Sequence, residues 1–295
     1  MSPLRIIDPH IHLWDLSTGL YPQFETPSVS FIGDNTAIAR SYLLAEYLDE
    51  GEGSVIIEGA VHVEAMPTDG LRELDFLQAV AASAPIPIGI IAAGNPADPQ
   101  FTKFLDQCAT SPAFRGVRQV LNRHAAAQFN YVDTDFMADQ QFSMGLNELG
   151  SRGGVFDLQV YPHQMAQAAR QAANAGGTTI VLNHAGMWVD RNGAGWRAFK
   201  QGLKVLAAEP NIQVKISGLG MFDMQWTTES IRPLVLETIE AFGPDRCMFA
   251  SNFPVDKLFS TYAALWKAFD AITSDLSESD HARLFRETAK RVYRL

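Results

Sequence analysis

Short apolar segments that suit buried strands recur along the whole chain, and stretches with helical periodicity lie between most of them. The strands are predicted at residues 5–10, 54–64, 86–94, 114–121, 154–160, 178–184, 211–217 and 246–252. Residues 70–84 and 164–176 are examples of the helical stretches between them. Alternating strands and helices are typical of a parallel sheet, and eight such units close naturally into a (β/α)8 (TIM) barrel. We therefore predict an α/β fold with a single barrel domain over residues 1–295.

A doubly wound open sheet is the alternative arrangement of the same elements. The first predicted strand is not followed by the G-x-G-x-x-G segment that marks dinucleotide-binding open sheets. No internal repeat or Pro/Gly-rich linker divides the chain. Its last segment, 277–295, opens with Ser277 and Asp280 at capping-box spacing and continues as an amphipathic pattern. We expect this segment to form the last outer helix of the barrel.

Aromatic residues are frequent in the long connections that follow several predicted strands. The connection after the first strand contains Trp14, Phe24 and Phe31, and the one after the fourth contains Phe129 and Tyr131. Long strand-to-helix loops lie on the catalytic face of such a barrel. These residues form either a lid and stacking surface or local cores beneath the loops.

Polar side chains recur on one face of most of the predicted strands. In chain order they are Asp8, His10 and His12; Glu58, His62 and Glu64; Arg118; Asp157 and Gln159; His184; Lys215 and Ser217; and Asn252. The opposite, apolar faces should contact the outer helices, which places the polar sets inside the barrel near its carboxyl-end mouth. Isolated buried polar groups are costly, so agreement among seven strands favours a functional site over scattered, internally satisfied groups.

The histidine pair of the first strand is the most specific part of this set. His10 and His12 are two positions apart, so they share one side of a strand. Neutral imidazole is the commonest nitrogen ligand for zinc and related ions. The alternative interpretation is a polar strand end with no chemical role.

Composition narrows the class of partner. The chain has 295 residues, 47% hydrophobic residues and a net charge of −10. This charge, without any basic cluster, disfavours nucleic acid or an anionic membrane as a partner, and a small molecule is expected instead. The only two cysteines, Cys108 and Cys247, argue against a disulfide framework. We expect no export signal, no membrane span and a cytoplasmic location; nothing in the sequence indicates an oligomeric state.

Six motifs carry a resemblance to a known family. They are DPHIHLWD, RGVRQVLNRH, FDLQVYPHQ, VLNHAGM, VKISGLGM and CMFASNFPVDK, in order from residue 8 to 257. The chain resembles the amidohydrolase-related lactonases of the amidohydrolase superfamily, such as L-fuconolactonase, L-rhamnono-lactonase and 2-pyrone-4,6-dicarboxylate lactonase. The resemblance implies a distorted (β/α)8 barrel. It also implies a site made by His10 and His12, by His184 at the end of the sixth strand, and by an acid at position 252.

Position 252 departs from the family pattern, because this chain has Asn252. An amide can coordinate a cation but cannot act as a base at neutral pH. Asp256 or Asp157 is therefore the candidate base. If a divalent metal is bound, zinc being the expected ion, its ligands are His10, His12 and His184. Without a carboxylate ligand, we expect the metal to be weakly held or absent.

The expected reaction is the opening of a sugar-acid or aromatic-catabolism lactone by an activated water. Arg118 and Lys215 suit a carboxylate or an oxyanion, although an internal ion pair of Arg118 with Glu64 or Asp157 is the alternative. The candidate substrate-binding residues are Arg118, Lys215, Gln159, His62, Glu64 and Trp14. Two other functions stay open: an isomerase or decarboxylase of the same superfamily, and a non-catalytic small-molecule-binding barrel.

Overall fold

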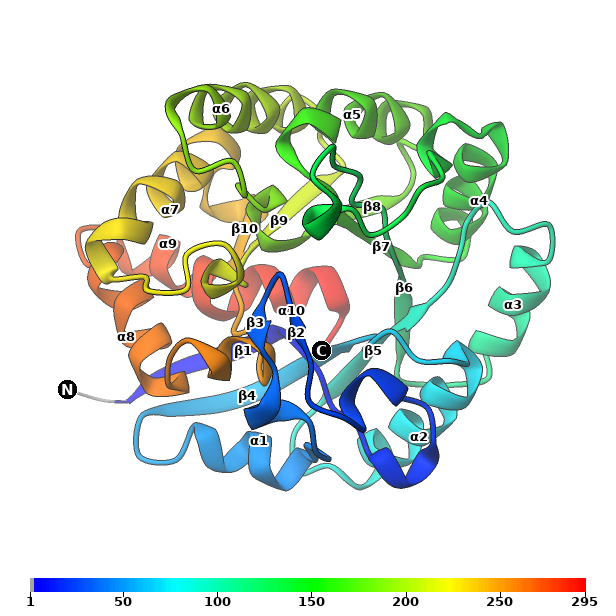
Figure 1. Cartoon of the computed structure of the whole chain (residues 1–295), viewed down its shortest axis with the longest axis horizontal. Helices are drawn as coiled ribbons and strands as arrows, with labels where there is room; N and C mark the ends of the chain where they lie inside the picture. The colour runs from blue at the N-terminus through cyan, green and yellow to red at the C-terminus, as the bar shows by residue number, and fades with distance from the viewer. Residues whose placement is uncertain (1–2) are drawn as a thin grey trace.

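The computed structural model describes residues 3–295, and eight parallel strands form its central sheet (Figure 1). They are β1 (Leu4–Ile11), β4 (Val55–Val63), β5 (Ile88–Ala93), β6 (Phe114–Val120), β7 (Val155–Gln159), β8 (Thr179–Leu182), β9 (Ile212–Ile216) and β10 (Cys247–Phe249). Neighbouring strands follow one another in this order. A bridge between Ile11 and Phe253 brings the two edges of the sheet together. The predicted (β/α)8 barrel is thus confirmed, with all eight strands near their predicted positions.

Eight helices surround the barrel in chain order (Figure 1). They are α1 (Leu44–Glu50), α2 (Gly70–Ser83), α3 (Phe101–Cys108), α4 (Gln140–Ser151), α5 (Met165–Asn174), α6 (Gly193–Ala207), α7 (Thr228–Phe242) and α8 (Tyr262–Ile272). Side-chain caps fix where several begin: the Asp69 carboxylate accepts the first free N–H groups of α2, and Asn192 does so for α6. Such caps satisfy donors that have no partner within the helix.

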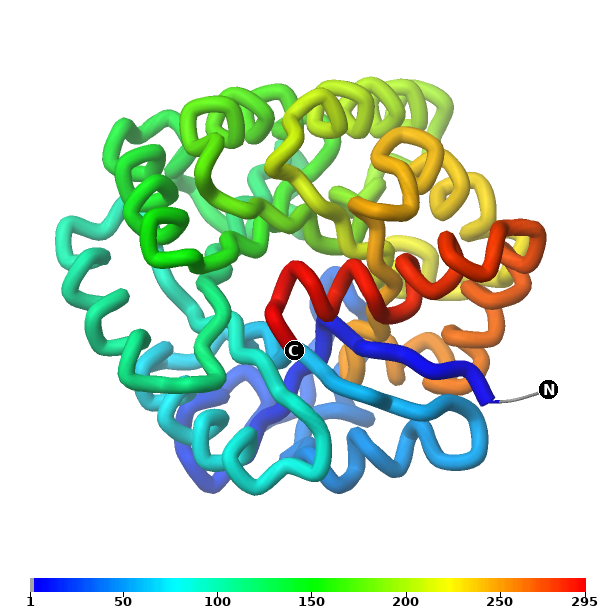
Figure 2. Tube along the Cα trace, turned by 180° about the vertical axis from the view of Figure 1, so that it is seen from behind, coloured from blue at the N-terminus to red at the C-terminus, as the bar shows by residue number. Residues whose placement is uncertain are grey.

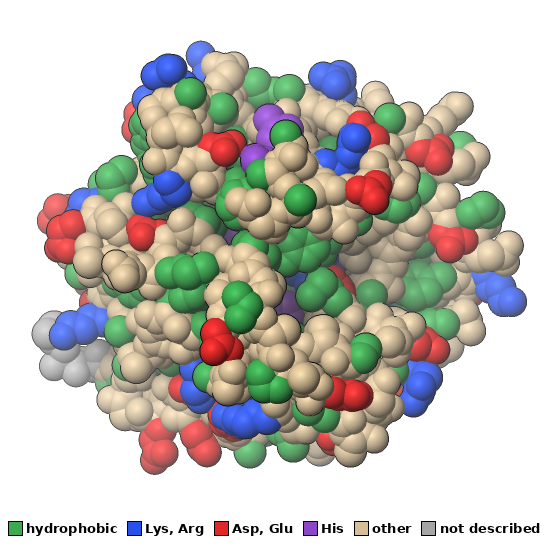
Figure 3. All heavy atoms as spheres, viewed as in Figure 1, with side chains coloured by type: hydrophobic (Ala, Val, Ile, Leu, Met, Phe, Trp, Pro, Cys, Tyr) green, Lys and Arg blue, Asp and Glu red, His purple; other side chains and the backbone are tan. Residues whose placement is uncertain are grey.

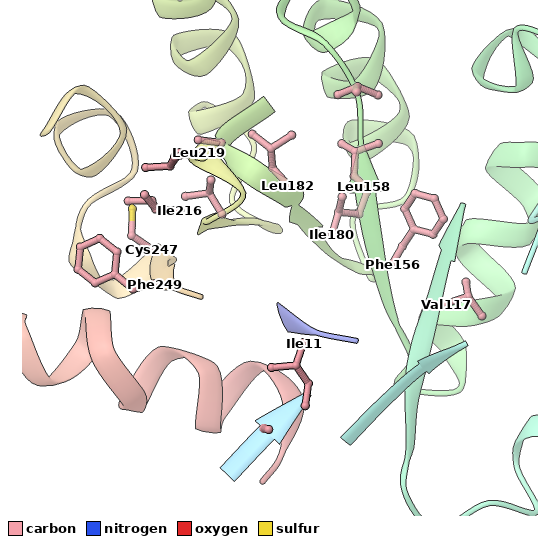
Figure 4. Close-up of a cluster of buried hydrophobic side chains, with 14 of the residues drawn as sticks. Ile11, Val117, Phe156, Leu158, Ile180, Leu182, Ile216, Leu219, Cys247 and Phe249 are labelled. Carbon is pink, nitrogen blue, oxygen red and sulfur yellow. The ribbon is translucent and has the colours of Figure 1, made fainter. Parts of the chain in front are cut away.

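The main hydrophobic core lies between the strands and these helices. Figure 4 shows part of it, with Val117, Phe156, Leu158, Ile216 and Phe249 among the labelled side chains. Because side chains alternate along a strand, the neighbours Arg118, Asp157, Gln159 and Lys215 are directed to the inside of the barrel. For these strands the predicted inner and outer faces are confirmed.

The sequence predicted that the C-terminal segment forms the last outer helix of the barrel. This prediction is wrong. The segment comprises α9 (Glu278–Ala282), a π-helical turn (Arg283–Glu287) and α10 (Thr288–Tyr293), and Ser277 caps its start as predicted. Figure 2 shows the end of this segment crossing the face opposite the mouth. Val292 and Tyr293 pack there against Ile7, Val61 and Met248 from inside the barrel. A helix outside the barrel and a helix across this face both bury one apolar stripe, so both have the same amphipathic pattern.

Two irregularities in β1 and β4 overturn part of the predicted face assignment. The pairing register shifts between Ile6 and Ile7, and again between Asp8 and Ile11. Each extra residue exchanges the two faces of a strand. His10 and His12 consequently point inward, whereas Asp8 points outward and accepts hydrogen bonds from Tyr47 and Tyr262.

The same shifts correct the placement of His62. Val61 and Val63 belong to the inner cluster with Ile7, so His62 lies on the outer face of β4. Its Nδ1 accepts a hydrogen bond from the Leu13 N–H at 3.1 Å, and its Nε2 is 3.7 Å from Glu73 of α2. The prediction that His62 faces the inside of the barrel is therefore wrong.

Two further expectations can be compared with the structure. Cys108 and Cys247 are both buried and free, so no disulfide links them. Within residues 3–295, no helix has the length and apolar character needed to cross a membrane.

Candidate active site

A cavity of about 230 Å³ opens at the carboxyl end of the strands. Of the predicted site residues, its lining includes His12, Trp14, Arg118, Gln159, His184 and Asn252. Figure 3 views this face and shows hydrophobic side chains gathered over its centre, with a histidine visible among them. A larger hollow of about 1050 Å³ lies beside the N-terminal strand, and its described lining contains none of the predicted residues.

Three histidine rings meet at the floor of the cavity. The His10 ring centroid lies 5.0 Å from that of His12 and 4.6 Å from that of His184. Burial holds the pKa of all three well below the usual value; the positive charge of Arg118 lowers all three further, and that of Lys215 lowers those of His10 and His184. The imidazoles are therefore neutral at pH 7. Among residues 3–295, neither ring nitrogen of His10 has a hydrogen-bond partner.

Strained backbone positions two of the floor residues. His184 has φ 55° and Asn252 has φ 59°, in the left-handed region that side chains other than glycine rarely adopt. A Cβ on Gly218 would lie 2.5 Å from His184 Nδ1, so only glycine allows this approach. The Ser217 hydroxyl lies 3.0 Å from the same nitrogen. Such strain is concentrated at functional sites because the surrounding structure must enforce it.

His12 and Asn252 each direct a hydrogen-bond acceptor at the other. His12 Nδ1 lies 2.7 Å from the Val63 carbonyl oxygen, which can only accept, so Nδ1 carries the ring proton and Nε2 carries a lone pair. This Nε2 is 3.3 Å from Asn252 Oδ1, which is also an acceptor. The Asn252 amide is held in this orientation because its Nδ2 donates to Asp256 at 2.6 Å.

Asp256 supports Asn252 from behind and does not line the cavity. Its other oxygen accepts the Gly220 N–H at 3.0 Å. Burial raises the pKa of Asp256 to about 7. The structure thus places this candidate base one side chain away from the space that a substrate would occupy.

Arg118 forms the polar side wall of the cavity together with Gln159. Its Nε donates to the Glu64 carboxylate at 2.6 Å and its Nη1 donates to Gln159 Oε1 at 3.1 Å. Nη2 donates to the Glu64 carbonyl oxygen. The predicted internal ion pair of Arg118 with Glu64 is therefore present. Arg118 also lines the cavity, so the ion pair does not exclude contact with a substrate. Glu64 therefore contacts the site through Arg118.

Lys215 and Asp157 form a buried ion pair beneath the floor, with an Nζ–Oδ2 distance of 2.5 Å. Asp157 also accepts a hydrogen bond from the Tyr293 hydroxyl at 2.7 Å, and Lys215 Nζ lies 4.8 Å from the centroid of the Tyr293 ring. Burial lowers the pKa of Lys215 to about 8 although Asp157 opposes the shift. Neither residue lines the cavity, so neither is placed to contact a substrate directly.

With this geometry established, comparison with known proteins identifies the family. Residues 7–295 match the family model described as amidohydrolase. The chain belongs to the amidohydrolase family. It is 42% identical to the protein y4mH of Sinorhizobium fredii over 301 residues, covering all of both chains. It is 25% identical to the L-fucono-1,5-lactonase of Burkholderia multivorans over 307 residues, covering 100% of this chain and 97% of that protein.

A solved amidohydrolase structure shares the fold over almost its whole length. It is the Burkholderia multivorans amidohydrolase with bound zinc, with a TM-score of 0.83 and 25% identity, and the match covers 98% of this chain and 99% of that one. The resemblance to this family that the motifs indicated is therefore confirmed.

The donor set of this amidohydrolase does not fit a tightly held divalent cation. Within residues 3–295, no group of three or more His, Cys, Asp or Glu side chains is placed to hold a metal ion. The predicted ligands His10, His12 and His184 are joined by a neutral amide at position 252 in place of a carboxylate, so none of the four donors carries negative charge to offset that of a divalent cation. Arg118 and Lys215 contribute positive charge around His10 and His184, and this charge repels a divalent cation.

Sequence reasoning missed residues that reach the site from loops and from the C-terminus. Ile32, Met221 and Val255 line the cavity, and Tyr293 supports the floor from α10. Ile32 could have been predicted, because it belongs to the long aromatic-rich connection after the first strand, which was expected at this face. No sequence pattern distinguishes Tyr293 from an ordinary core tyrosine.

Proposed function

We propose that this amidohydrolase is a hydrolase that opens the lactone ring of a small molecule by attack of a water. The observation that carries the proposal is that two neutral, buried histidines and Asn252 share one small cavity with Arg118. The lactonase name of the 25% identical relative supports the same reaction class.

His12 and Asn252 would hold the attacking water. Their Nε2 and Oδ1 atoms, 3.3 Å apart, are both acceptors, so one water can donate a hydrogen to each. The oxygen lone pairs of that water then remain free for attack on the lactone carbonyl. His12 Nε2 is the group that takes the proton as the bond forms, because an amide oxygen cannot do so at neutral pH.

His184, which lines the cavity, would act on the lactone carbonyl as its oxygen becomes negative. His10 lies outside the cavity lining and contacts the rings of both His12 and His184, so it would act as a positioning residue for the two. Donors prearranged where charge develops contribute several kcal/mol to such reactions, about 3–4 kcal/mol for one donor. Arg118 is assigned to a substrate anion, through the N–H groups that Glu64 and Gln159 leave unpaired.

Asp157 and Asp256 would act as positioning residues rather than as bases. Asp256 fixes the Asn252 amide, and Asp157 fixes Lys215. This arrangement explains how hydrolysis can proceed with an amide at position 252.

A pH-indicator screen tests the proposal. Aldonolactones, aldarolactones and pyrone carboxylates are incubated with the purified protein, and one proton should be released per lactone opened. No opening above the spontaneous rate for any lactone would contradict the proposal. Release of carbon dioxide, or a product isomeric with the substrate, would favour a decarboxylase or an isomerase instead.

A further inference from the structure

The upper part of the cavity is made by loop side chains that are mostly apolar. The β2–β3 hairpin (β2, Val29–Ser30; β3, Gly33–Asp34) lies over the mouth (Figure 1). Its tip residue Phe31 contacts Tyr131 edge-to-face, with ring centroids 5.5 Å apart. Met221 and Val255 complete this roof from the loops after β9 and β10. A ligand in the cavity is therefore covered by hydrocarbon and aromatic surface.

Most amide side chains in the lining are already engaged within the protein. The Gln23 amide nitrogen donates to the carbonyl oxygens of Ala65 and Met66 at 2.8 and 3.2 Å. Asn35 Oδ1 accepts the Ser28 N–H at 2.6 Å. Asn252 is held by Asp256. A site that discriminates for ring hydroxyls needs polar groups that pair with them, and here the three amides of Gln23, Asn35 and Asn252 are engaged with the protein itself.

One positive side chain faces this space. Arg118 is the single Lys or Arg in the described lining of the cavity. Glu64 and Gln159 take three of its five N–H groups, which leaves two. Two N–H donors match the two oxygens of one carboxylate. A second carboxylate would lie against the apolar roof without a partner, which is unfavourable.

We propose that the substrate is a small lactone with an apolar ring or ring substituent and one carboxylate. A polyhydroxylated sugar lactone and a dicarboxylate are both poor matches for this cavity. This inference rests on the proposed lactone opening. The volume of about 230 Å³ suits one ring, since ligand cavities for larger molecules are roughly 300–1,000 Å³.

Three lactones separate the possibilities in one assay. They are 2-pyrone-5-carboxylate, with one carboxylate; 2-pyrone-4,6-dicarboxylate, with two; and L-fucono-1,5-lactone, with hydroxyl groups. We expect kcat/KM for the monocarboxylate to exceed the other two by about tenfold or more, since a buried polar group left without a partner weakens binding. Equal or faster opening of the sugar lactone or of the dicarboxylate would overturn the inference and leave lactone hydrolysis intact.

Binding of unreactive analogues separates failure of the inference from failure of the proposed function. Calorimetry with benzoate, isophthalate and L-fuconate measures the same preference without any ring opening. Tighter binding of benzoate supports the inference even if no lactone is opened. Tighter binding of isophthalate or L-fuconate, or no binding of benzoate, overturns it.

Two hairpin variants test the roof directly. Phe31→Ser should raise KM for the monocarboxylate several-fold and leave kcat nearly unchanged. Val29→Ser is the matched control, because Val29 lies on the same hairpin but is 82% exposed and outside the cavity lining. Equal effects of the two variants, or no effect of Phe31→Ser, would overturn the assignment of the roof.

Arg118→Gln tests the carboxylate contact. It should abolish the preference for 2-pyrone-5-carboxylate over its neutral methyl ester. Because Glu64 would lose its buried partner, the double variant Arg118→Gln/Glu64→Gln is measured as well. Retention of the preference in a folded variant would show that Arg118 does not bind the carboxylate.

Discussion

The floor and the roof of the cavity are built in opposite ways. The floor consists of polar side chains at strand ends, all buried, with the His10 ring in contact with those of His12 and His184. The roof consists of apolar side chains on loops, including Phe31 at the tip of a short hairpin. Groups that react must be held in position by a rigid framework, whereas a hydrophobic wall tolerates small displacements. We therefore assign the reaction to the floor and the choice of substrate to the roof.

Removing a floor histidine should have the largest effect. We expect His12→Ala to lower kcat by ~10²-fold or more, as is typical when a group that acts on the transition state is lost. His10→Ala should lower kcat as strongly, because the His10 ring positions those of His12 and His184. Lactone opening and thermal unfolding are measured on the same preparations. Activity within a few-fold of the unsubstituted protein would show that the pair is only a polar strand end.

Breaking the ion pair under the floor should affect stability. Lys215→Met leaves Asp157 charged and fully buried, which costs ~3–5 kcal/mol in comparable cases. Chemical denaturation measures this loss of unfolding free energy. The double variant Lys215→Met/Asp157→Asn is the control, and it should recover much of the loss because no charge is left unpaired. A single variant as stable as the parent would mean that the ion pair contributes nothing to stability.

The carboxyl behind Asn252 should produce a pH effect on stability. Burial raises the pKa of Asp256 to about 7 from its ordinary value of 3.8, so the folded state binds its proton more tightly than the unfolded state does. The resulting stabilisation is complete below pH 3.8 and is lost as pH rises through 7. Asp256→Asn should remove a decline of up to about 1.4 kcal/mol per pH unit between these values. Parallel stability curves for the two proteins would contradict this pKa shift.

Asn252→Asp tests the metal content of the floor. A carboxylate beside three neutral imidazoles adds the anionic ligand that the site lacks, so bound zinc should increase on elemental analysis. We expect the unsubstituted protein to lose zinc on dialysis against a chelator. Stoichiometric zinc that survives this dialysis would show that neutral donors suffice here.

A roof substitution should have the smallest effect. Ile32→Ala removes part of the apolar lining, and the partly buried side chain contributes about 1 kcal/mol to ligand binding. KM should rise a few-fold and kcat should stay within about twofold. A large fall in kcat would assign the roof a part in the reaction and end the distinction drawn between roof and floor.

Much of the barrel could be predicted from the sequence because hydrophobic alternation is a local property. The inner positions of four residues followed from alternation alone: Arg118, Asp157, Gln159 and Lys215. The pairing of β6 with β7, of β7 with β8 and of β8 with β9 shows no shift in register. Asp8 and His62 were misplaced because an extra residue in a strand leaves no mark in the hydrophobic pattern. The location of α10 was missed because an amphipathic helix fits equally well outside the barrel or under it.

The barrel, the family and the residue types at the floor, including the amide at position 252, could all be inferred from the sequence. Which of those residues share the cavity depends on how the folded chain packs. That packing places Asp256 behind Asn252, Asp157 and Lys215 beneath the histidines, and the side chains of distant loops above them. The reason is physical: strand periodicity acts over a few residues, whereas the direction of a loop side chain depends on contacts with residues far away in the chain.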